Sequence, residues 1–378
     1  MSVHNISVYI SVLLSLCAAV YFFHIILYII GLLRLDSGGN DTLLSVSVIV
    51  PARNEEESIV ACMESLLAQN YPKSLYEVIV IDDHSEDRTA SIVQKIAESA
   101  PNLSLINLPR DENFQSGKKT AISQGIRHST HHIILTTDAD CIVQKDWIRS
   151  MISHFNQNVG LVSGPVMIDK RHENNFFHRI QSLEFLSLVL AGAGSIGIGQ
   201  PRIANGANFG YRKDLYEKLN GFEGIDRLRS GDDDLFMQKA ARESKLAVSF
   251  ARDREAVITT KPKADIQSFM NQRIRWASKG AHYQNTLFII YLISVYLFYL
   301  GLFLSLPLAF FFSTLPVLPV ILFFMKLIAD FALLLTGTII LGRRDLLVYL
   351  LPAALFQIIY VLIAGALGLR GKYQWKGR

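Results

Sequence analysis

The sequence is short of charge, and the shortage is concentrated in two stretches. Asp, Glu, Lys and Arg make up 19% of the 378 residues, whereas hydrophobic residues make up 50%. Soluble domains usually carry more charge than this. None of these four residue types occurs from 8 to 33 or from 280 to 325. Because roughly 20 apolar residues cross a bilayer as a helix, the sequence predicts a membrane protein and excludes an ordinary soluble one.

The missing charges also indicate how many helices cross the membrane. No Lys or Arg precedes residue 8, which argues against a cleaved signal peptide, because such peptides begin with a basic region. We predict one N-terminal span and about three C-terminal spans: 8–33, then roughly 286–306, 314–341 and 346–369. Arg34 follows the first span, so the positive-inside rule predicts a multi-pass protein of the cell inner (cytoplasmic) membrane whose middle domain is cytoplasmic.

The basic tail, residues 370–378, conflicts with this count of spans. Three C-terminal spans would place the tail outside, yet it carries Arg370, Lys372, Lys376 and Arg378. A fourth short crossing would return the tail to the cytoplasm, but it would export Arg343 and Arg344. The sequence leaves both arrangements open.

Cysteine and net charge are scarce as well. The three cysteines (Cys17, Cys62 and Cys141) form no CxxC motif and no metal-ligand spacing. Unpaired cysteines suit a reducing cytoplasm. A net charge of +4 provides no basic stripe, so we expect no nucleic-acid partner.

Between the apolar stretches, in residues 42–265, short β-branched runs alternate with helical patterns. Strands are predicted at 45–50, 77–81, 103–108, 132–136 and 160–164, and helices at 54–69, 87–99 and 118–128. This alternation predicts an α/β domain with a mostly parallel sheet and helices on both faces. Ligands of such sheets bind beyond the carboxyl ends of the strands, so the polar residues after each strand form the candidate site.

Asp138 and Asp140 follow the fourth predicted strand. Two carboxylates spaced i and i+2 in an extended turn can reach one cation. Their hard oxygen atoms suit Mg²⁺ or Mn²⁺, with diphosphate oxygens completing the ligand shell. A polar turn that caps a helix is the alternative, because Asp is common in such turns.

Asp82 and Asp83 end the second predicted strand, and Lys118 precedes a predicted helix. A carboxylate at a strand end could accept hydrogen bonds from a base or a ribose, or it could cap the next helix. Lys118 could meet a phosphate near a helix N-terminus, or it could be a solvated basic turn. The glycine spacing around it is not that of a P-loop.

Three successive acids, Asp232, Asp233 and Asp234, start a predicted helix. They repel one another, which is costly unless a basic group or a metal lies nearby. One of them could be the general base for an acceptor hydroxyl. Alternatively, Asp232 could be the N-cap, with the other two in the first turn of the helix.

Residues 266–284 predict an amphipathic helix at the membrane surface, because apolar residues recur there at helical spacing. It contains Gln272, Arg275 and Trp276. These side chains could line the site, with the Arg neutralising a departing diphosphate and the Trp stacking on a sugar. Otherwise the helix is only an interfacial anchor.

Taken in order over residues 45–280, these motifs resemble glycosyltransferase family 2, which has the Rossmann-like GT-A fold. The matching segments are VSVIVPARNEEESI (46–59), VIVIDDHSEDRT (78–89), GKKTAISQGI (117–126), TTDADC (136–141), the acceptor-side segment 205–224, SGDDDLF (230–236) and QRIRW (272–276). The resemblance thus includes the DxD and QxxRW motifs of membrane-bound, bacterial-type members.

The resemblance also implies residue roles. Pro51, Arg53 and Glu55 would line the nucleotide pocket, Asp82 or Asp83 would hold uridine or guanosine with Lys118 nearby, and Asp138 and Asp140 would hold ribose and metal. Counting three residues back from Leu235 places the catalytic base at Asp232. Gly231 stands where many relatives have Glu, which keeps Asp233 as an alternative base.

The implied activity is that of an inverting, metal-dependent, hexosyltransferase-type enzyme. It would transfer sugar from a UDP- or GDP-sugar to a lipid or lipid-linked acceptor at the cytoplasmic membrane face. The alternative is a processive polysaccharide synthase that couples polymerisation to export; such enzymes generally have more spans. A transporter with a vestigial domain is a third reading, because Lys326 and Asp330 lie in an apolar segment. The intact set of acids argues against it.

Overall fold

The computed structural model describes residues 3–109, 117–225, 231–308 and 317–369. The chain divides into two compact units. The sheet unit comprises Leu33–His172 and Gly192–Lys261, and the helical unit comprises Met1–Leu32, Glu173–Ala191 and Pro262–Arg378. The predicted domain 42–265 therefore lies in the sheet unit except for 173–191 and 262–265.

The sheet unit is built on a seven-stranded sheet with the order β3-β2-β1-β4-β8-β6-β9. The strands are β1 (Val46–Ala52), β2 (Tyr76–Asp82), β3 (Leu103–Asn107), β4 (Ile133–Thr136), β6 (Val159–Ser163), β8 (Phe209–Arg212) and β9 (Ala247–Phe250). The first four strands are mutually parallel, and β8 runs antiparallel to β4 and β6. The predicted α/β fold with a mostly parallel sheet is confirmed.

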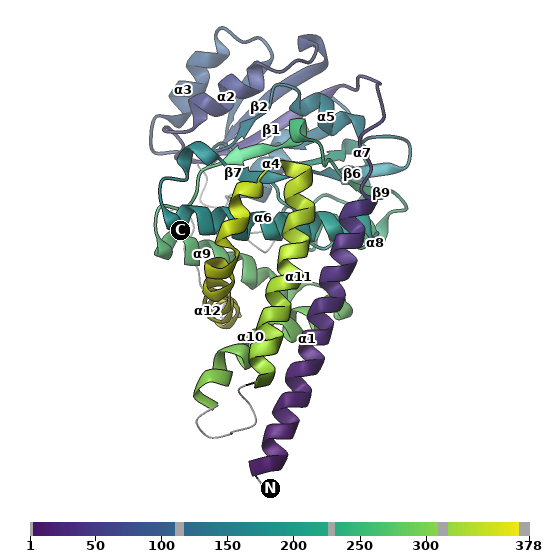
Figure 1. Cartoon of the computed structure of the whole chain (residues 1–378). Coiled ribbons are helices and arrows are strands. Elements are labelled where there is room, and N and C mark those ends of the chain that lie inside the picture. The colour runs from purple at the N-terminus through teal and green to yellow at the C-terminus, as the bar shows by residue number, and fades with distance from the viewer. Residues whose placement is uncertain (1–2, 110–116, 226–230, 309–316, 370–378) are drawn as a thin grey trace. The chain divides into compact units, whose positions relative to one another are not determined.

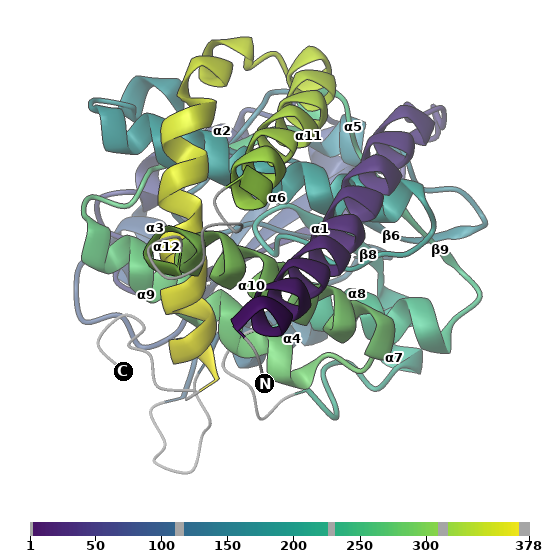
Figure 2. The ribbon, with the colours of Figure 1, turned by 60° about the horizontal axis from the view of Figure 1, so that its bottom comes forward.

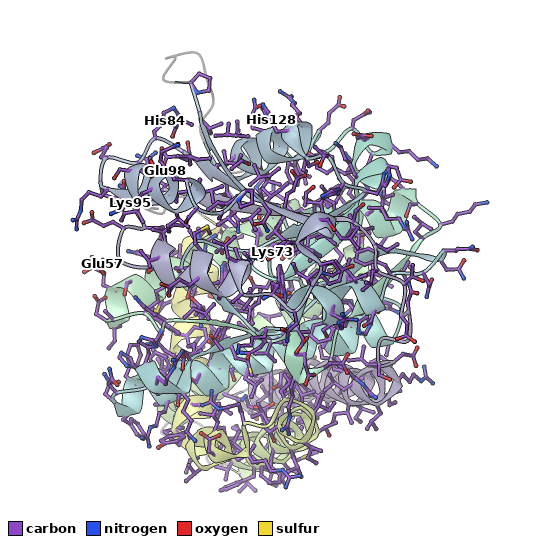
Figure 3. All side chains as sticks on the ribbon, turned by 90° about the horizontal axis from the view of Figure 1, so that it is seen from above. Glu57, Lys73, His84, Lys95, Glu98 and His128 are labelled. Atoms are coloured by element: carbon purple, nitrogen blue, oxygen red, sulfur yellow. The ribbon has the colours of Figure 1, made fainter. Side chains whose placement is uncertain are left out.

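Helices cover this sheet on both faces because its central strands are apolar on both sides. In β1, Val48, Ile49 and Val50 are all fully buried. The helices are α2 (Ile59–Leu67), α3 (Thr89–Ala97), α4 (Lys118–His128), α5 (Trp147–Ser153), α7 (Lys213–Lys218) and α8 (Asp234–Glu243), with short 3₁₀ turns η1 (Lys73–Leu75), η2 (Lys170–His172) and η3 (Arg254–Ala256). Figure 1 shows α2 and α3 beside β2, and Figure 3 shows the exposed side chains of Glu57, Lys95 and Glu98 on this layer.

A second, three-stranded sheet was not predicted. It has the order β5-β10-β7, formed by β5 (Ile142–Val143), β10 (Ile258–Thr260) and β7 (Val166–Ile168). Its strands are only two or three residues long, so they are too short to show an alternating pattern in the sequence.

The first helix of the domain begins later than predicted. We predicted a helix from residue 54, whereas α2 begins at Ile59. The N–H groups of Asn54, Glu55 and Glu56 donate instead to the side chains of Ser85, Thr89 and Asp87, which follow β2. These bonds fix the loop after β1 in a non-helical conformation, with Asn54 at a φ of 51°.

The helical unit contains α1 (Val3–Arg34), most of α6 (Phe176–Gly197), α9 (Ile266–Ala277), η4 (Ser278–His282), α10 (Thr286–Leu308), α11 (Val317–Leu341), η5 (Arg344–Tyr349) and α12 (Leu350–Gly368). Among the described residues, five helices are long and apolar enough to cross a membrane. Four of them match the predicted spans. Residues 314–316 of the third predicted span and the basic tail 370–378 lie outside the described residues.

The fifth of these helices, α6, was not predicted and differs from the others. It is 72% buried, whereas the other four are 22–39% buried. Figures 1 and 2 show α6 lying crosswise to α1 and α11. Helices at such different inclinations cannot all cross one bilayer, so apolar composition alone does not make α6 a span. Its polar residues, Arg179 and Glu184 among them, interrupt the apolar pattern in the sequence.

A buried ion pair links the helices of the helical unit. Lys326 on α11 is fully buried and donates to Asp330, one turn later, at 2.5 Å and to Gln357 of α12 at 3.0 Å. The hydroxyl of Tyr21 on α1 donates to the same Asp330. The i,i+4 pair therefore neutralises itself inside a closed network, as the spacing suggested.

Candidate active site

The candidate site lies at the carboxyl ends of β2, β1 and β4. Strand order reverses at β1, because β2 lies on one side of it and β4 on the other. In open α/β sheets this switch point forms the ligand-binding crevice. Ala52 is in register with Asp82, and the N–H of Thr137 donates to Ile49, so the loops after all three strands are neighbours.

At this edge one lysine bridges two carboxylates that are far apart in the sequence. The Nζ atom of Lys118, the first residue of α4, lies 2.6 Å from Oδ1 of Asp138 and 3.3 Å from Oδ2 of Asp232. Asp138 follows β4, and Asp232 precedes α8. The structure thus brings together three residues that the sequence singled out in three separate motifs.

The charge of Lys118 is fixed by these partners. Burial favours the neutral amine and by itself would lower the pKa of Lys118. The attraction of Asp138 and then of Asp232 outweighs burial, so the pKa of Lys118 is raised above its ordinary value. Lys118 therefore remains an ammonium at any physiological pH.

Gly206 makes room for this bridge. A Cβ atom at position 206 would lie 2.7 Å from Oδ2 of Asp232 and 3.2 Å from Nζ of Lys118. The glycine is held in place by Thr136, whose hydroxyl donates to the Gly206 carbonyl at 2.9 Å. The sequence analysis noted Gly206 only as part of the 205–224 segment, because the steric reason for it is visible only in three dimensions.

The three successive acids have different surroundings. Asp233 is the N-cap of α8: its Oδ1 accepts from the N–H of Asp234 at 2.7 Å, and its Oδ2 accepts from the N–H of Gly206 at 3.2 Å. Asp234 accepts from the N–H of Leu235 and is 1% exposed. The cap is therefore Asp233, and the alternative of Asp232 as the cap is wrong.

Asp232 has a buried carboxylate oxygen whose surroundings differ from those of its neighbours. Within the described residues, its Oδ2 receives no hydrogen bond, although Lys118 lies close enough for an ion pair. Because its neighbours use their oxygens to cap α8, Asp232 is the acid of this run best able to accept a proton.

The residue before Asp232 has a backbone reason to be glycine. Gly231 has a φ of 91°, which L side chains rarely adopt, and an added Cβ would lie 2.4 Å from Cδ1 of Leu235. This chain therefore cannot carry the Glu of many relatives at position 231 in the same backbone conformation.

The predicted nucleotide-binding residues lie on the neighbouring loops. Pro51 is in β1, and Arg53 and Glu55 follow it. The guanidinium of Arg53 donates to the carbonyl of Asp83 at 3.4 Å, and Asp82 accepts from the N–H of Ser85 at 3.1 Å. Both acids are buried at the end of β2. The structure thus places the two predicted sets side by side.

Two buried thiols lie beside the predicted metal ligands, and the sequence analysis did not connect them with the site. Cys62 of α2 donates to the carbonyl of Asp138 at 3.7 Å, and Cys141 donates to Oδ1 of Asp140 at 3.6 Å. Burial, followed by the charges of Asp140 and Asp138, raises the pKa of both thiols. Neither is a reactive thiolate; both pack beneath the DxD turn.

The chemistry of Asp138 and Asp140 fits a hard divalent cation, because each offers carboxylate oxygens in one short turn. Neither side chain is fully buried, so a ligand can approach. No cluster of three or more His, Cys, Asp or Glu residues suited to a metal occurs in the described parts of the chain.

The QRIRW segment belongs to the other unit, on α9. Its buried arginine is Arg273, which forms a bidentate ion pair with Glu184 of α6. The ring of Trp276 stacks on Phe185 of α6, with centroids 5.9 Å apart, and the Arg273 guanidinium lies 4.4 Å from the Trp276 ring centre. Gln272 accepts a hydrogen bond from Arg273. Sequence reasoning had singled out Arg275, which is partly exposed, and had missed Arg273.

The comparisons with known proteins agree with this geometry. Residues 47–220 match the model of "Glycosyl transferase family 2". That stretch contains β1, β2, β4, the DxD turn and Lys118. This stretch of the chain is similar to glycosyl transferase family 2.

Two relatives illustrate the similarity in sequence. The chain is 30% identical over 213 residues to glycosyltransferase AglE of Haloferax volcanii, covering 56% of this chain and 66% of AglE. It is 33% identical over 151 residues to the poly-β-1,6-N-acetyl-D-glucosamine synthase of Staphylococcus aureus, covering 39% of this chain and 34% of the synthase. The chain thus spans less than two thirds of either relative.

A solved structure shares the fold of this chain. The mannosyltransferase PcManGT of Pyrobaculum calidifontis, in complex with GDP-Man and Mn²⁺, aligns with a TM-score of 0.59 at 20% identity. The alignment covers 97% of this chain and 98% of PcManGT. At this identity the likeness shows a common fold, and it supports the GT-A architecture of the sheet together with the additional helices.

Proposed function

We propose that this protein is an inverting, hexosyltransferase-type glycosyltransferase that moves one sugar from a nucleotide-diphosphate sugar to a lipid or lipid-linked acceptor. The observation that carries the proposal is the bridge from Lys118 to both Asp138 and Asp232. It joins the DxD turn, where a donor would bind, to an acid whose Oδ2 accepts no hydrogen bond among the described residues, where an acceptor would be activated.

The donor would lie across the loops after β1, β2 and β4. Pro51, Arg53 and Glu55 would line the nucleotide, and Asp82 or Asp83 would accept hydrogen bonds from the base. Asp138 would face the ribose, and Asp138 and Asp140 would hold Mg²⁺ or Mn²⁺. When bound, such a cation would neutralise the diphosphate. The neighbour PcManGT holds GDP-Man with Mn²⁺, which supports a GDP- or UDP-sugar and a divalent cation here.

Asp232 would serve as the general base. The acceptor O–H bond breaks, and its proton passes to Oδ2 of Asp232. The acceptor oxygen bonds to the anomeric carbon while the bond from that carbon to the diphosphate oxygen breaks. The electron pair leaves with the nucleoside diphosphate. Attack from the far side inverts the carbon, as the family resemblance implies.

Lys118 would hold the base in place during this step. It is already engaged by Asp138 and Asp232, so its role is to orient Asp232 and to balance the negative charge around it. Asp233 remains the alternative base, but both of its oxygens accept backbone hydrogen bonds, which favours Asp232.

The acceptor and the location are proposed from the apolar helices. Five helices are long and apolar enough for a membrane, and Arg34 follows the first of them. A multi-pass protein of the inner membrane with a cytoplasmic sheet unit would meet a lipid acceptor at the cytoplasmic face. As the family resemblance implies, Gln272, Arg275 and Trp276 of α9 would have catalytic roles, with Arg275 neutralising the leaving diphosphate.

A processive polysaccharide synthase is the second candidate. The relative named as a poly-β-1,6-N-acetyl-D-glucosamine synthase favours it, with a polysaccharide in place of the lipid acceptor. The number of candidate spans argues for single addition, because an exported polymer needs helices to form a channel.

The test is a panel of UDP- and GDP-sugars added to the purified protein with Mn²⁺, with Mg²⁺ or with EDTA. We expect one donor to raise the thermal unfolding midpoint and to be hydrolysed slowly, both only with a divalent cation. Product length with a lipid acceptor then separates the two candidates. Undiminished binding and hydrolysis in EDTA would contradict the metal assignment, and no response to any donor would contradict the activity.

A further inference from the structure

Residues 344–368 are apolar enough to cross the membrane, but their contacts are not those of a crossing helix. The segment contains η5 and α12, and all of the contacts below lie within the helical unit. In these contacts, the two ends of the segment lie against residues that are near the sheet unit in sequence.

The first end is tied to Glu173. The guanidinium of Arg343, just before η5, donates to Glu173 at 2.5 Å. Two residues of α6 hold the end of η5 as well: Arg179 donates to the Tyr349 hydroxyl at 2.6 Å, and Phe176 packs on the Tyr349 ring. Glu173 directly follows His172, the last residue of that part of the sheet unit. The start of the segment therefore lies beside Glu173, the residue at which the chain passes from the sheet unit into the helical unit.

The middle of α12 lies along α9. The ring of Phe356 lies 5.4 Å from that of Phe269 near the start of α9, and the ring of Tyr360 is equally close to Phe269. The Tyr360 hydroxyl donates to Glu184, which also pairs with Arg273. The apolar face of α9 is thus covered by α12.

The far end of α12 lies at the far end of α9. A Cβ atom on Gly368 would lie 2.8 Å from Cβ of Ala277 and 3.0 Å from the backbone nitrogen of Ser278. Ser278 begins the polar stretch SKGAHYQN, residues 278–285, which leads into α10. Such a stretch belongs at the water interface where α10 begins.

From these contacts we infer that residues 344–368 do not cross the bilayer, and that α12 lies obliquely within the leaflet nearest the sheet unit. The contacts decide this rather than the length, because α12 alone is about 28 Å long and η5 adds to it. Because Gly368 ends beside Ala277, α12 cannot reach the opposite face. Figure 1 shows α11 along its length and Figure 2 shows α12 along its length, as expected for helices at different inclinations.

The outer face of α12 fits the acyl chains of one leaflet. A row of side chains at four-residue spacing is exposed along the whole helix: Leu351, Leu355, Ile359, Ile363 and Leu367. The opposite face packs on α9 and α10. This face is apolar along its whole length and therefore suits contact with acyl chains.

This arrangement removes the conflict over the basic tail. With α1, α10 and α11 as the crossings, Arg343 and Arg344 lie on the side of the sheet unit. If α12 does not cross, then Arg370, Lys372, Lys376 and Arg378 follow on that same side. All of these charges then obey the positive-inside rule together.

The test locates three points of the full-length chain in intact cells. Ser74→Cys on the sheet unit and Arg344→Cys before α12 place thiols at exposed positions, to be labelled with a membrane-impermeant maleimide. The unmodified chain is the blank, because Cys17, Cys62 and Cys141 are buried. The C-terminus is located by two fusions after Arg378, one to a fluorescent protein that folds only in the cytoplasm and one to an alkaline phosphatase that is active only outside.

We expect both thiols to be labelled only after the cells are permeabilised, with a fluorescent tail and an inactive phosphatase. Opposite locations of Arg344 and the tail would show that the segment crosses and would overturn the inference. So would a tail on the opposite side from Ser74. None of these readouts uses catalytic activity, so the result is independent of the proposed function.

Discussion

Lys118 in the sheet unit and Lys326 in the helical unit both pair with carboxylates, but Lys118 is 18% exposed whereas Lys326 is fully buried, and their partners are arranged differently. Lys326 donates hydrogen bonds to Asp330 and Gln357, and the Tyr299 ring centre lies 5.4 Å from its ammonium. The Tyr21 hydroxyl donates to the same Asp330. Lys118 is shared by two carboxylates, one of which keeps an oxygen without a hydrogen bond among the described residues. The closed network suits helix packing, whereas the shared lysine suits a site that still has a proton and a ligand to accept.

The same contrast holds within the QRIRW segment. Arg273 is matched by the bidentate Glu184, whereas Arg275 is partly exposed. A buried ion pair such as Arg273–Glu184 has a structural role, because removing one partner leaves the other charge buried. The following variants test this distinction.

The largest effect is expected for Asp140→Ala. It removes a carboxylate from the DxD turn, so transfer should be abolished and cation-dependent nucleotide binding should be lost. Donor binding is measured by thermal shift with and without Mn²⁺. The protein should still fold, because Asp140 lies after a strand end and is only partly buried. A variant that still transferred sugar in a cation-dependent way would show that the metal is held elsewhere.

Asp232→Asn should lower turnover by about 10²–10⁴-fold, as is usual when a general base is removed. Donor affinity should change little, since this acid would face the acceptor. Asp233→Asn and Asp234→Asn are the matched controls and should be milder, because their carboxylates bond backbone N–H groups at the start of α8. A dead Asp233→Asn beside an active Asp232→Asn would move the base by one residue.

Arg273→Met should lower the free energy of unfolding. Removing one partner of a buried ion pair typically costs about 3–5 kcal/mol, because Glu184 would be left buried without its counter-ion. The unfolding midpoint in detergent should fall clearly. Arg275→Met, at a partly exposed position two residues away, should lower the midpoint less than Arg273→Met and should reduce turnover. Trp276→Ala should reduce turnover and also lower the midpoint, because its ring stacks on Phe185 and lies against Arg273. Full activity in both of the latter variants would make the QRIRW segment an anchor only.

Lys118→Met should lower turnover by about 10²-fold, comparable to the loss of one donor at a charged reaction centre. If Lys118 positions Asp232, the donor dissociation constant should change much less than turnover. Lys119→Met is the control: its ammonium is buried against the carbonyl of Ile225 and does not enter the bridge. A large loss of donor affinity with unchanged turnover would instead make Lys118 a phosphate ligand.

The smallest effect is expected for Gly206→Ala, at about tenfold in turnover, equivalent to about 1.4 kcal/mol. The added methyl would push Asp232 and Lys118 apart without changing any charge. Gly39→Ala is the control, because a Cβ there meets no atom within 4 Å. Equal activity of both variants would show that the bridge tolerates displacement.

Much of this molecule could be predicted from the sequence, because the relevant signals are local. Buried parallel strands are continuous apolar runs, so β1 and β2 were found within one or two residues of their true ends. Long stretches without charge identified α1, α10, α11 and α12. The acids that follow strands were found because chain order alone places them at one edge of a parallel sheet.

What only the tertiary structure decided depends on residues far apart in the chain. The Lys118 bridge, the space left by Gly206 and the pairing of Glu184 with Arg273 each join distant segments, and no local pattern records them. The choice of Asp233 as the N-cap followed from the positive φ of Gly231, which sets where α8 begins. Whether an apolar helix crosses the bilayer or stays within one leaflet depends on the residues that its two ends contact. Composition alone carries no information about those contacts.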